Sequence, residues 1–265
     1  MVVDLLESWL TRAPRPVRAL GFLREAAGIR RRAAHCRVNW KEHLDQCQAQ
    51  IVNSIHLCPT QRKAVIFGAG LLHDLPIQTL AEKFQHVYLV DIVHPFFSRR
   101  STKSYTNVHR IQSDITNTIN DVYEASDDPD RPLPLAQPTM FLDDPEVDLI
   151  LSLNILSQLP CLPIRYLKKW GAHSAAKIEA YARNLIAAHL DYMQRFGGRT
   201  LLITDTVMNT INLEGKLVKQ DDLLYGMTLP PSESEWEWRL APAPEVNRHF
   251  HYFRKVVCIA RAGRS

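Results

Sequence analysis

The sequence predicts an α/β fold in which helices cover both faces of a mostly parallel sheet, preceded by a helical N-terminal extension. From Lys63 onward, short runs rich in β-branched residues alternate with segments of helical spacing, the pattern of parallel strands joined by crossover helices. Near the end of the chain, two strand-like segments are separated only by a proline-containing loop, which predicts an antiparallel pair. We therefore expect residues 1–60 to form the extension and residues 61–265 the domain that contains the sheet.

The extension is expected to consist of helices that pack on the sheet domain. Its first segment, VRALGFLREAAGIRRRAAHC, has helical composition, and Asn39 with Glu42 has the spacing of a capping pair. The apolar residues that follow recur at steps of three and four and form one helix stripe, namely Trp40, Leu44, Cys47, Ile51 and Ile55. We expect this stripe to be buried on the body of the protein. An exposed stripe would instead indicate a homodimer.

A metal site in the extension is a competing interpretation. His35, Cys36, His43 and Cys47 provide ligand types, and the last two have i,i+4 spacing. Cys47 belongs to the apolar stripe, however, and adjacent residues such as His35 and Cys36 point to different faces of a helix. We therefore expect no metal.

The sheet domain contains a regular series of elements. The expected strands are KAVIF, VYLVD, VHRIQ, VDLILSLN and RTLLITD, followed by the terminal pair EWEWRLAP and HYFRKVVCIARA. A helix is expected in IQTLAEKF, and two more between residues 163 and 196. Residues 116–146, which are rich in proline and acidic residues, predict an exposed loop.

The composition favours a cytoplasmic globular protein. Of the 265 residues, 46% are apolar, and no apolar run reaches the roughly 18 to 20 residues that a membrane helix needs. The first residues, MVVDLLESWLTRAPRP, lack the basic-then-apolar order of a secretion signal. The five cysteines are scattered and odd in number, which argues against a disulfide framework.

A glycine turn follows the first expected strand, in the stretch AVIFGAGLLHDLP. Gly68 and Gly70 allow a tight turn and a close approach of the backbone to a ligand. The next helix is expected to begin near Asp74, Leu75 and Pro76, with Asp74 as its cap. Free N–H groups at such a helix start favour a carboxylate or a phosphate.

Two acidic residues strengthen the case for a ligand site. Asp91 ends the second expected strand, 21 residues beyond Gly70, where a carboxylate can accept hydrogen bonds from the ribose of a bound adenosine. Asp114 follows the third expected strand. Because the carboxyl ends of parallel strands share one edge of the sheet, we expect the glycine turn and both acids to lie together.

In combination, these pieces resemble the class I S-adenosylmethionine-dependent methyltransferases. The matching pieces are FGAG at 67–70, LVD at 89–91, SD at 113–114, VDLILSLN at 147–154, FGGRTLLITD at 196–205 and the terminal strand pair. The resemblance implies a Rossmann-like sheet of seven strands with a reversed C-terminal strand, and S-adenosyl-L-methionine as cofactor across the switch point. The cofactor-binding residues that it implies are Gly68, Ala69, Gly70, Asp91, Ile92, Asp114, Ile115 and Asn154.

The resemblance also implies a role for several of these positions. Residues 68–70 would pass under the methionine part, Asp91 would hold the ribose, Asp114 would face the adenine amine, and Asn154 would lie beside the sulfonium. The chain departs from the family at Phe67, where an acid is frequent, and at Leu72, where a third glycine is frequent. These departures put the methionine pocket in question.

The expected reaction is methyl transfer to an oxygen or nitrogen of a small-molecule acceptor. The sequence after the fourth strand, SLNILSQLP, lacks the Asn-Pro-Pro-Tyr type of motif found in enzymes that methylate nucleic-acid bases and glutamine. Three alternatives stay open: aminocarboxypropyl or aminopropyl transfer on the same fold, an inactive scaffold, and an NAD-dependent dehydrogenase. His73, His94 and His173 are candidate bases, and the sequence does not rank them.

The extension is expected to act as a lid over the acceptor. It carries nine Lys/Arg against five Asp/Glu, whereas residues 61–265 hold 23 of each, so the net charge of +4 resides in the extension. This surplus favours an acceptor with a carboxylate or phosphate, and the neutral body disfavours a nucleic-acid partner. The rest of the acceptor site is expected from residues 155–175 and 206–250, where Trp236 and Trp238 would face one side of a strand.

Overall fold

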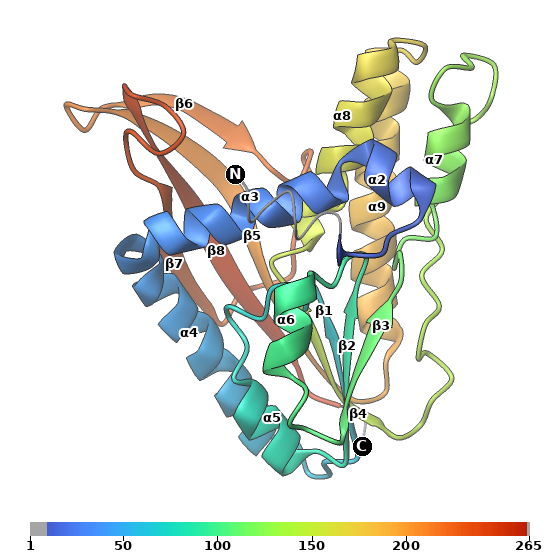
Figure 1. Ribbon diagram of the computed structural model, residues 1–265, viewed down its shortest axis with the longest axis vertical. Helices are drawn as coiled ribbons and strands as arrows, with labels where there is room; N and C mark the ends of the chain where they lie inside the picture. The colour runs from blue at the N-terminus through green and yellow to red at the C-terminus, as the bar shows by residue number, and fades with distance from the viewer. Residues whose placement is uncertain (1–9, 264–265) are drawn as a thin grey trace.

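An eight-stranded sheet forms the centre of the fold (Figure 1). The computed structural model describes residues 10–263, so the predictions about residues 1–9, including the one on a secretion signal, lie outside the described residues. The strands are β1 (Lys63–Phe67), β2 (His86–Asp91), β3 (Val108–Gln112), β4 (Val147–Leu153), β5 (Arg199–Asn212), β6 (Leu217–Asp222), β7 (Ser234–Ala241) and β8 (Phe250–Arg261).

The strand order confirms the predicted architecture. Seven strands follow the path β3-β2-β1-β4-β5-β8-β7. Strands β1 to β5 pair in parallel, and β8 runs antiparallel to both β5 and β7. The sheet is therefore Rossmann-like with a reversed C-terminal strand.

The eighth strand, β6, is a feature that the sequence did not predict. Strand β5 pairs with β4 only over residues 199–203 and then continues to Asn212. The chain turns back at Gly215, which has a φ of 80°, and β6 pairs with the outer part of β5. Strand β6 was not predicted because its sequence, LVKQDD, is mostly charged and polar. An exposed strand of this kind lacks the alternation of apolar residues that indicates a strand.

Helices cover both faces of the sheet. They are α2 (Arg15–Leu20), α3 (Phe22–His35), α4 (Arg37–His56), α5 (Ile77–Lys83), α6 (Phe96–Ser101), α7 (Ile119–Ala125), α8 (Cys161–Trp170) and α9 (Ala175–Arg195), with a short 3₁₀ turn at Leu156–Gln158. Helices α4 and α5 share one hydrophobic core with the sheet, whereas α9 packs on residues of the opposite face such as Val65 and Ile150. None of the described helices combines the length and the apolarity that crossing a membrane requires.

The predicted stripe of α4 is buried, as expected. Trp40, Cys47, Ile51 and Ile55 are at most 3% exposed, and Leu44 is half-buried. The indole N–H of Trp40 donates to the carbonyl of Leu240, 2.8 Å away on β7. The stripe thus anchors α4 to the C-terminal strands.

Two predicted helix starts are wrong. Helix α4 begins at Arg37, almost continuous with α3, so Asn39 lies inside the helix and caps nothing. The joint keeps helical hydrogen bonds on both sides, because the Cys36 N–H donates to Arg32 and its carbonyl accepts from Trp40. Helix α5 begins only at Ile77, without a side-chain cap, so Asp74 is not its capping residue.

Residues 116–146 are not a wholly exposed loop. The segment contains α7, whose Ile119 and Val122 are buried against Val17 and Leu20 of α2. The many acidic residues and prolines around this short helix masked its apolar positions. The two helices predicted between residues 163 and 196 are present as α8 and α9.

Candidate functional site

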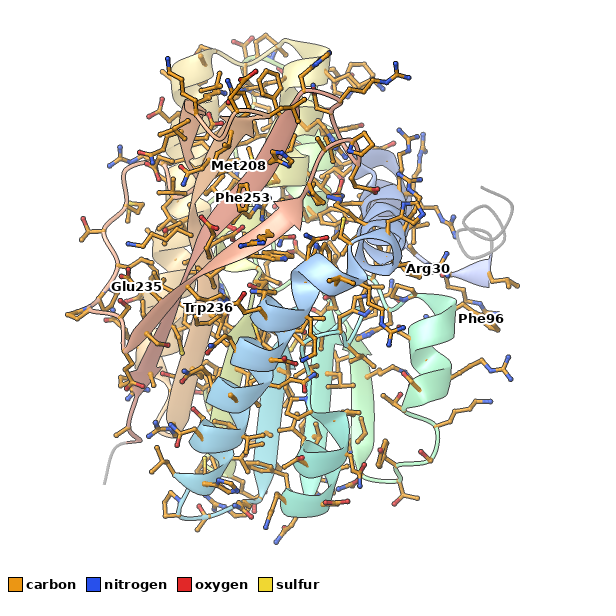
Figure 2. The ribbon with its side chains drawn as sticks, turned by 90° about the vertical axis from the view of Figure 1, so that its left-hand side faces the viewer. Arg30, Phe96, Met208, Glu235, Trp236 and Phe253 are labelled. Atoms are coloured by element: carbon orange, nitrogen blue, oxygen red, sulfur yellow. The ribbon has the colours of Figure 1, made fainter. Side chains whose placement is uncertain are left out.

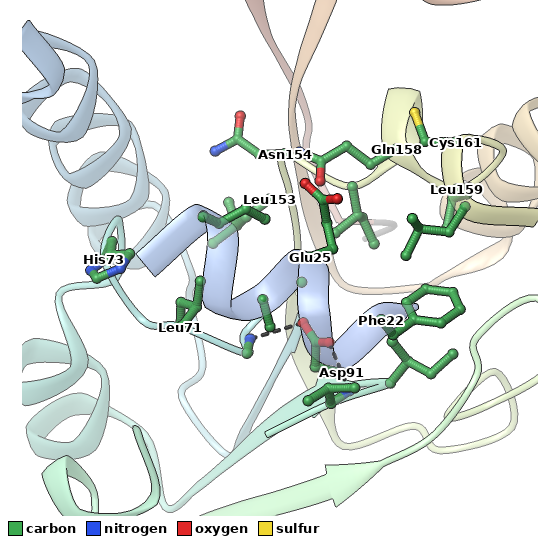
Figure 3. Close-up of a pocket in the computed structure, with 18 of the residues that line it drawn as sticks. Phe22, Glu25, Leu71, His73, Asp91, Leu153, Asn154, Gln158, Leu159 and Cys161 are labelled. Atoms are coloured by element: carbon green, nitrogen blue, oxygen red, sulfur yellow. Dashed lines mark hydrogen bonds between the residues drawn. The ribbon is translucent and has the colours of Figure 1, made fainter. Parts of the chain in front are cut away.

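A cavity of about 420 Å³ lies at the carboxyl ends of β1, β2 and β4 (Figure 3). This volume falls within the range of roughly 300 to 1,000 Å³ for small-ligand pockets. The chain crosses from β1 to β2 on one side and β4 lies on the other, so the cavity is at the switch point of the sheet, where ligands bind in this architecture. The opposite wall comes from α3, α4, α8, β7 and β8.

The turn after β1 requires glycine at two positions. A Cβ on Gly68, where φ is +86°, would lie 2.4 Å from the carbonyl oxygen of Leu153. A Cβ on Gly70 would lie 2.8 Å from the carbonyl oxygen of Val93 and 2.9 Å from Oδ2 of Asp91. Leu72 has a φ of 62°, so the turn has a left-handed backbone at a residue that is not glycine.

Asp91 connects this turn to the end of β2. Its Oδ2 accepts a hydrogen bond from the Gly70 N–H at 2.8 Å, and its Oδ1 accepts one from the Val93 N–H at 3.1 Å (Figure 3). Burial raises the pKa of Asp91, whereas nearby His94 and these N–H groups lower it. A carboxylate can accept about four hydrogen bonds, so Asp91 keeps capacity for a ligand.

Asp114 has a structural role that the sequence did not predict. Its Oδ1 accepts from the N–H and the hydroxyl of Thr116, at 2.9 and 2.6 Å. Its Oδ2 accepts from the N–H groups of Thr118 and Ile119, at 2.8 and 2.9 Å. Asp114 lines the cavity, but these four hydrogen bonds fill the usual capacity of its carboxylate and hold the turn before α7.

Asp74 and Asn154 form a buried polar pair in the cavity wall. Asn154 has a φ of 53°, and its Nδ2 donates to Oδ2 of Asp74 at 2.9 Å. Burial raises the pKa of Asp74. The Oδ1 of Asn154 is buried and has no hydrogen-bond partner within residues 10–263. Asp74 was not predicted as a site residue, because its position before a helix suggested a cap.

Most of the predicted cofactor-binding residues meet at this cavity. Those that line it are Gly68, Gly70, Asp91, Ile92, Asp114, Ile115 and Asn154. Ala69 is fully buried in the hydrophobic core instead. Phe67 is also fully buried, with its ring 5.6 Å from that of Tyr192. Phe67 therefore fills the core.

The three candidate bases are separated in space. His73 lines the cavity. The Nε2 of His94 is 3.0 Å from the carbonyl oxygen of Ile111, and the Nε2 of His173 is 2.6 Å from that of Ala125. Since a carbonyl only accepts, both nitrogens are donors, and these two buried histidines support the backbone.

A stack of aromatic rings forms the wall opposite the glycine turn. The ring of His43 stacks on Trp238 with centroids 4.1 Å apart, and Trp40 meets Trp238 edge to face at 5.0 Å. All three residues line the cavity. Trp236, two residues before Trp238 on β7, lies on the side of α4 (Figure 2), and its indole N–H hydrogen-bonds the same histidine, as the predicted alternation requires.

The protonation of His43 follows from its partners. The indole N–H of Trp236 is 3.0 Å from Nδ1 of His43, and because an indole only donates, Nδ1 carries no proton. Burial lowers the pKa of His43 to about 4, so the ring is neutral near pH 7 with its proton on Nε2. Its Nε2 lies 3.6 Å from Sγ of Cys47. His43 thus has no lone pair left to act as a base.

Charged side chains also line this side of the cavity, namely Glu25, Arg32, Arg165 and Arg254. Asp205, fully buried on β5, accepts hydrogen bonds from Arg254 and from the hydroxyl of Ser157. Glu25 reaches into the cavity from α3 (Figure 3), where its carboxylate lies 3.8 Å from Arg32 and 3.6 Å from Arg165. Across residues 10–263, no three His, Cys, Asp or Glu side chains are grouped as metal ligands.

Comparisons with known proteins give a structural likeness only. No protein-family model matches the sequence, and no curated protein matches it. A complex of DhpI with S-adenosylhomocysteine is 11% identical, with 91% of this chain and 95% of that chain covered and a TM-score of 0.37. The N-methyltransferase NodS from Bradyrhizobium japonicum WM9, in complex with S-adenosyl-L-homocysteine, is 11% identical over 83% of this chain and 87% of its own, with a TM-score of 0.37.

A third structure is that of a 1,6-didemethyltoxoflavin-N1-methyltransferase from Burkholderia thailandensis, with 1,6-didemethyltoxoflavin and S-adenosylhomocysteine bound. It is 13% identical over 90% of this chain and 89% of its own, with a TM-score of 0.35. All three scores lie below 0.5, so these likenesses assign neither a family nor an activity to this chain.

Proposed function

We propose that the chain binds S-adenosyl-L-methionine in this cavity and transfers its methyl group to a small-molecule acceptor. One observation carries the proposal: a glycine turn and a buried acid, Asp91, share one cavity at the switch point of a sheet with a reversed C-terminal strand. Adenosyl ligands bind at such switch points, held by the turn and by an acid at the end of the second strand.

The residues present fit this cofactor. Gly68 and Gly70 leave the backbone open to a close approach, and Asp91 keeps acceptor capacity for ribose hydroxyls. Ile92 and Ile115 provide apolar contacts for the adenine. The Asp114 carboxylate is already saturated by hydrogen bonds, so its proposed contact with the adenine amine requires it to give up one of them.

Asp74 and Asn154 are suited to the amino-acid part of the cofactor. The Asp74 carboxylate supplies in the cavity the negative charge that Phe67 does not supply. The Oδ1 of Asn154 is an acceptor without a described partner, which an ammonium group would satisfy. We expect Asp74→Asn to weaken binding of S-adenosylhomocysteine more than Asp114→Asn does.

The main contribution of the protein to methyl transfer is to position the two substrates. When bound, the cofactor supplies a methyl group activated on a sulfonium. The chain's own residues hold the two substrates in line and exclude water from between them. Because His43 is neutral with both nitrogens engaged, we assign it to the wall of the acceptor site, and we assign no residue as catalytic base.

Helix α3 is the proposed lid over the acceptor. The α3 residues that line the cavity recur at helical spacing and form one face, consisting of Phe22, Glu25, Ala26, Ile29 and Arg32. Deleting residues 1–36 would remove the lid, but it would also remove Val17, Leu20 and Leu23 from the hydrophobic core. A Phe22→Ala/Ile29→Ala variant therefore tests the role of the lid with less damage to the fold. Affinity for S-adenosylhomocysteine should stay within a few-fold, whereas turnover of the acceptor should collapse.

Calorimetry and product analysis test the proposal. Heat from S-adenosylmethionine and S-adenosylhomocysteine, with none from NAD, is the expected result. S-adenosylhomocysteine as the product identifies methyl transfer, whereas methylthioadenosine would identify aminocarboxypropyl transfer. Heat from NAD alone would overturn the assignment, and no binding of any of these ligands would indicate a scaffold. We also propose a cytoplasmic location, supported by the scattered, odd-numbered cysteines.

A further inference from the structure

We propose that the acceptor is a compact apolar molecule with a carboxylate, and that Arg32 of α3 and Arg165 of α8 hold this carboxylate. The inference rests on the proposed function, since it assigns the second substrate of the same cavity. Both arginines line the cavity and approach it from different elements.

The two arginines share one carboxylate, that of Glu25. Its carboxylate lies between the two arginines, 3.8 Å from Arg32 and 3.6 Å from Arg165. Both separations exceed the 2.7 to 3.2 Å of a hydrogen bond, so a single carboxylate is shared between two guanidiniums without saturating either. Each guanidinium carries five N–H donors in a planar fork that matches a carboxylate. A second carboxylate, entering from the cavity, could accept hydrogen bonds from the remaining N–H donors of both guanidiniums.

The wall opposite the glycine turn carries more positive than negative charge. Arg32, Arg165 and Arg254 line it; the first two lie near the Glu25 carboxylate, and the third is bound to Asp205, which is fully buried. Arg254 is paired with Asp205, so among residues 10–263 Glu25 is the one acidic partner that Arg32 and Arg165 share. An anionic acceptor would neutralise the remaining positive charge of the arginine pair, whereas the carboxylates of Asp74, Asp91 and Asp114 belong to the glycine-turn end of the cavity. A cationic acceptor would have to compete with two arginines for one carboxylate.

The same wall also contains buried polar atoms that have no hydrogen-bond partner among the described residues. On this wall they are Nε1 of Trp238 and Nε of Arg254, neither of which has a hydrogen-bond partner in the part of the chain that the structure describes. The two residues are opposite each other on β7 and β8. Both atoms are donors only, so this wall is prepared for acceptor oxygens.

The surroundings of the arginine pair limit the rest of the acceptor. Apolar side chains that line the cavity beside it include Phe22, Ile29, Leu159 and Leu162. The side chain of Arg32 is 23% exposed and that of Arg165 is 59% exposed, so an ion pair formed with them is partly screened by solvent. The acceptor is therefore an apolar molecule with one anionic end. Because the two arginines already lie around a carboxylate, that of Glu25, we take the anionic group of the acceptor to be a carboxylate as well.

Calorimetry on the full chain loaded with S-adenosylhomocysteine tests the inference. The probes are matched acids and primary amides: 4-hydroxybenzoate with 4-hydroxybenzamide, and indole-3-acetate with indole-3-acetamide. We expect at least one acid to bind tenfold or more tightly than its amide, as charge-assisted hydrogen bonds imply. Arg32→Gln/Arg165→Gln should abolish this preference and leave affinity for S-adenosylhomocysteine within twofold.

The matched control is Arg31→Gln/Lys168→Gln, which removes the same charge from exposed neighbours on the same two helices and should keep the preference. If no acid binds more tightly than its amide while S-adenosylhomocysteine still binds, the inference is overturned. It is also overturned if the preference survives in the arginine variant, or if phenyl phosphate binds more tightly than both acids. Loss of S-adenosylhomocysteine binding by the unaltered chain would overturn the proposed function instead.

Discussion

The two ends of the cavity are built by different means. At the glycine turn, the contacts are made by backbone groups and by residues close in sequence, such as Gly70 with Asp91. At the aromatic wall, side chains about 200 residues apart meet, as when Trp40 donates to Leu240 and Trp236 to His43. The Gly70–Asp91 contact lies within one strand–turn–helix–strand unit. The aromatic wall depends on α4 being packed against the C-terminal strands.

The same difference appears in the polar chemistry. The glycine-turn end presents three carboxylates, those of Asp74, Asp91 and Asp114, whereas the aromatic wall presents an excess of donors. Substitutions at the aromatic wall should therefore affect stability and acceptor binding. Substitutions at the glycine turn should affect the adenosyl ligand.

The largest effect is expected from Trp40→Ala. It removes a side chain that is 3% exposed, together with its hydrogen bond to Leu240, and should lower the free energy of unfolding by about 3 to 5 kcal/mol. Urea denaturation measures this loss. Trp40→Phe is the control, since it keeps most of the packing and should cost much less. A loss below about 1 kcal/mol for Trp40→Ala would show that α4 does not anchor the wall.

The stability of the protein should fall as the pH drops from about 6.5 to about 4. Burial lowers the pKa of His43 to about 4 in the folded protein. Between pH 6.5 and pH 4, His43 is therefore protonated in the unfolded chain but neutral in the folded one, and this difference favours unfolding as the pH falls. The contribution of His43 to the free energy of unfolding is fully present above pH 6.5. It amounts to about 3 kcal/mol, at 1.36 kcal/mol for each unit of difference between the folded and unfolded pKa.

His189 provides the comparison for this pH effect. Burial also lowers its pKa to about 4, but it lies away from the wall and bonds Ser152. Urea denaturation at pH 7 and at pH 4.5 should show a smaller difference for His43→Gln, and likewise for His189→Gln, than for the unaltered chain. Equal differences in all three proteins would contradict the burial of these rings as neutral groups.

A smaller effect, at the other end of the cavity, is expected from Asp91→Ala. Loss of hydrogen bonds to a charged group should weaken binding of S-adenosylhomocysteine by about 1.5 to 3 kcal/mol. Calorimetry on the folded variant measures it. Trp40→Phe should leave this affinity nearly unchanged, which separates the two ends. Unchanged affinity in Asp91→Ala would remove the role of Asp91 in holding the ribose.

The smallest effect is expected from Asn39→Ala. Asn39 lies inside α4 rather than at its start, so the substitution should change the free energy of unfolding by less than about 0.5 kcal/mol in either direction. A cap would cost about 0.5 to 2 kcal/mol. A loss in the upper part of that range would restore Asn39 as the helix start.

The sequence by itself determined the order of strands and helices and the glycine-turn end of the site. Short β-branched runs, helical spacing and two glycines act over a few residues, so they can be interpreted without knowing the tertiary structure. The position of Asp91 followed from one strand–turn–helix–strand unit. The untested roles of these residues toward a ligand stay predictions.

Tertiary structure alone decided the contacts that the acids make within the chain. The sequence predicted Asp74 as a helix cap, yet Asp74 lies in the cavity with Asn154. Asp114 lines the cavity and also holds the turn before α7, and its contact with a ligand stays a prediction. A carboxylate next to a helix start can accept from the local N–H groups or turn elsewhere, and the choice depends on backbone geometry that the residue type does not encode. The aromatic wall and the arginine pair were likewise beyond prediction, because they arise from packing between segments distant in the chain.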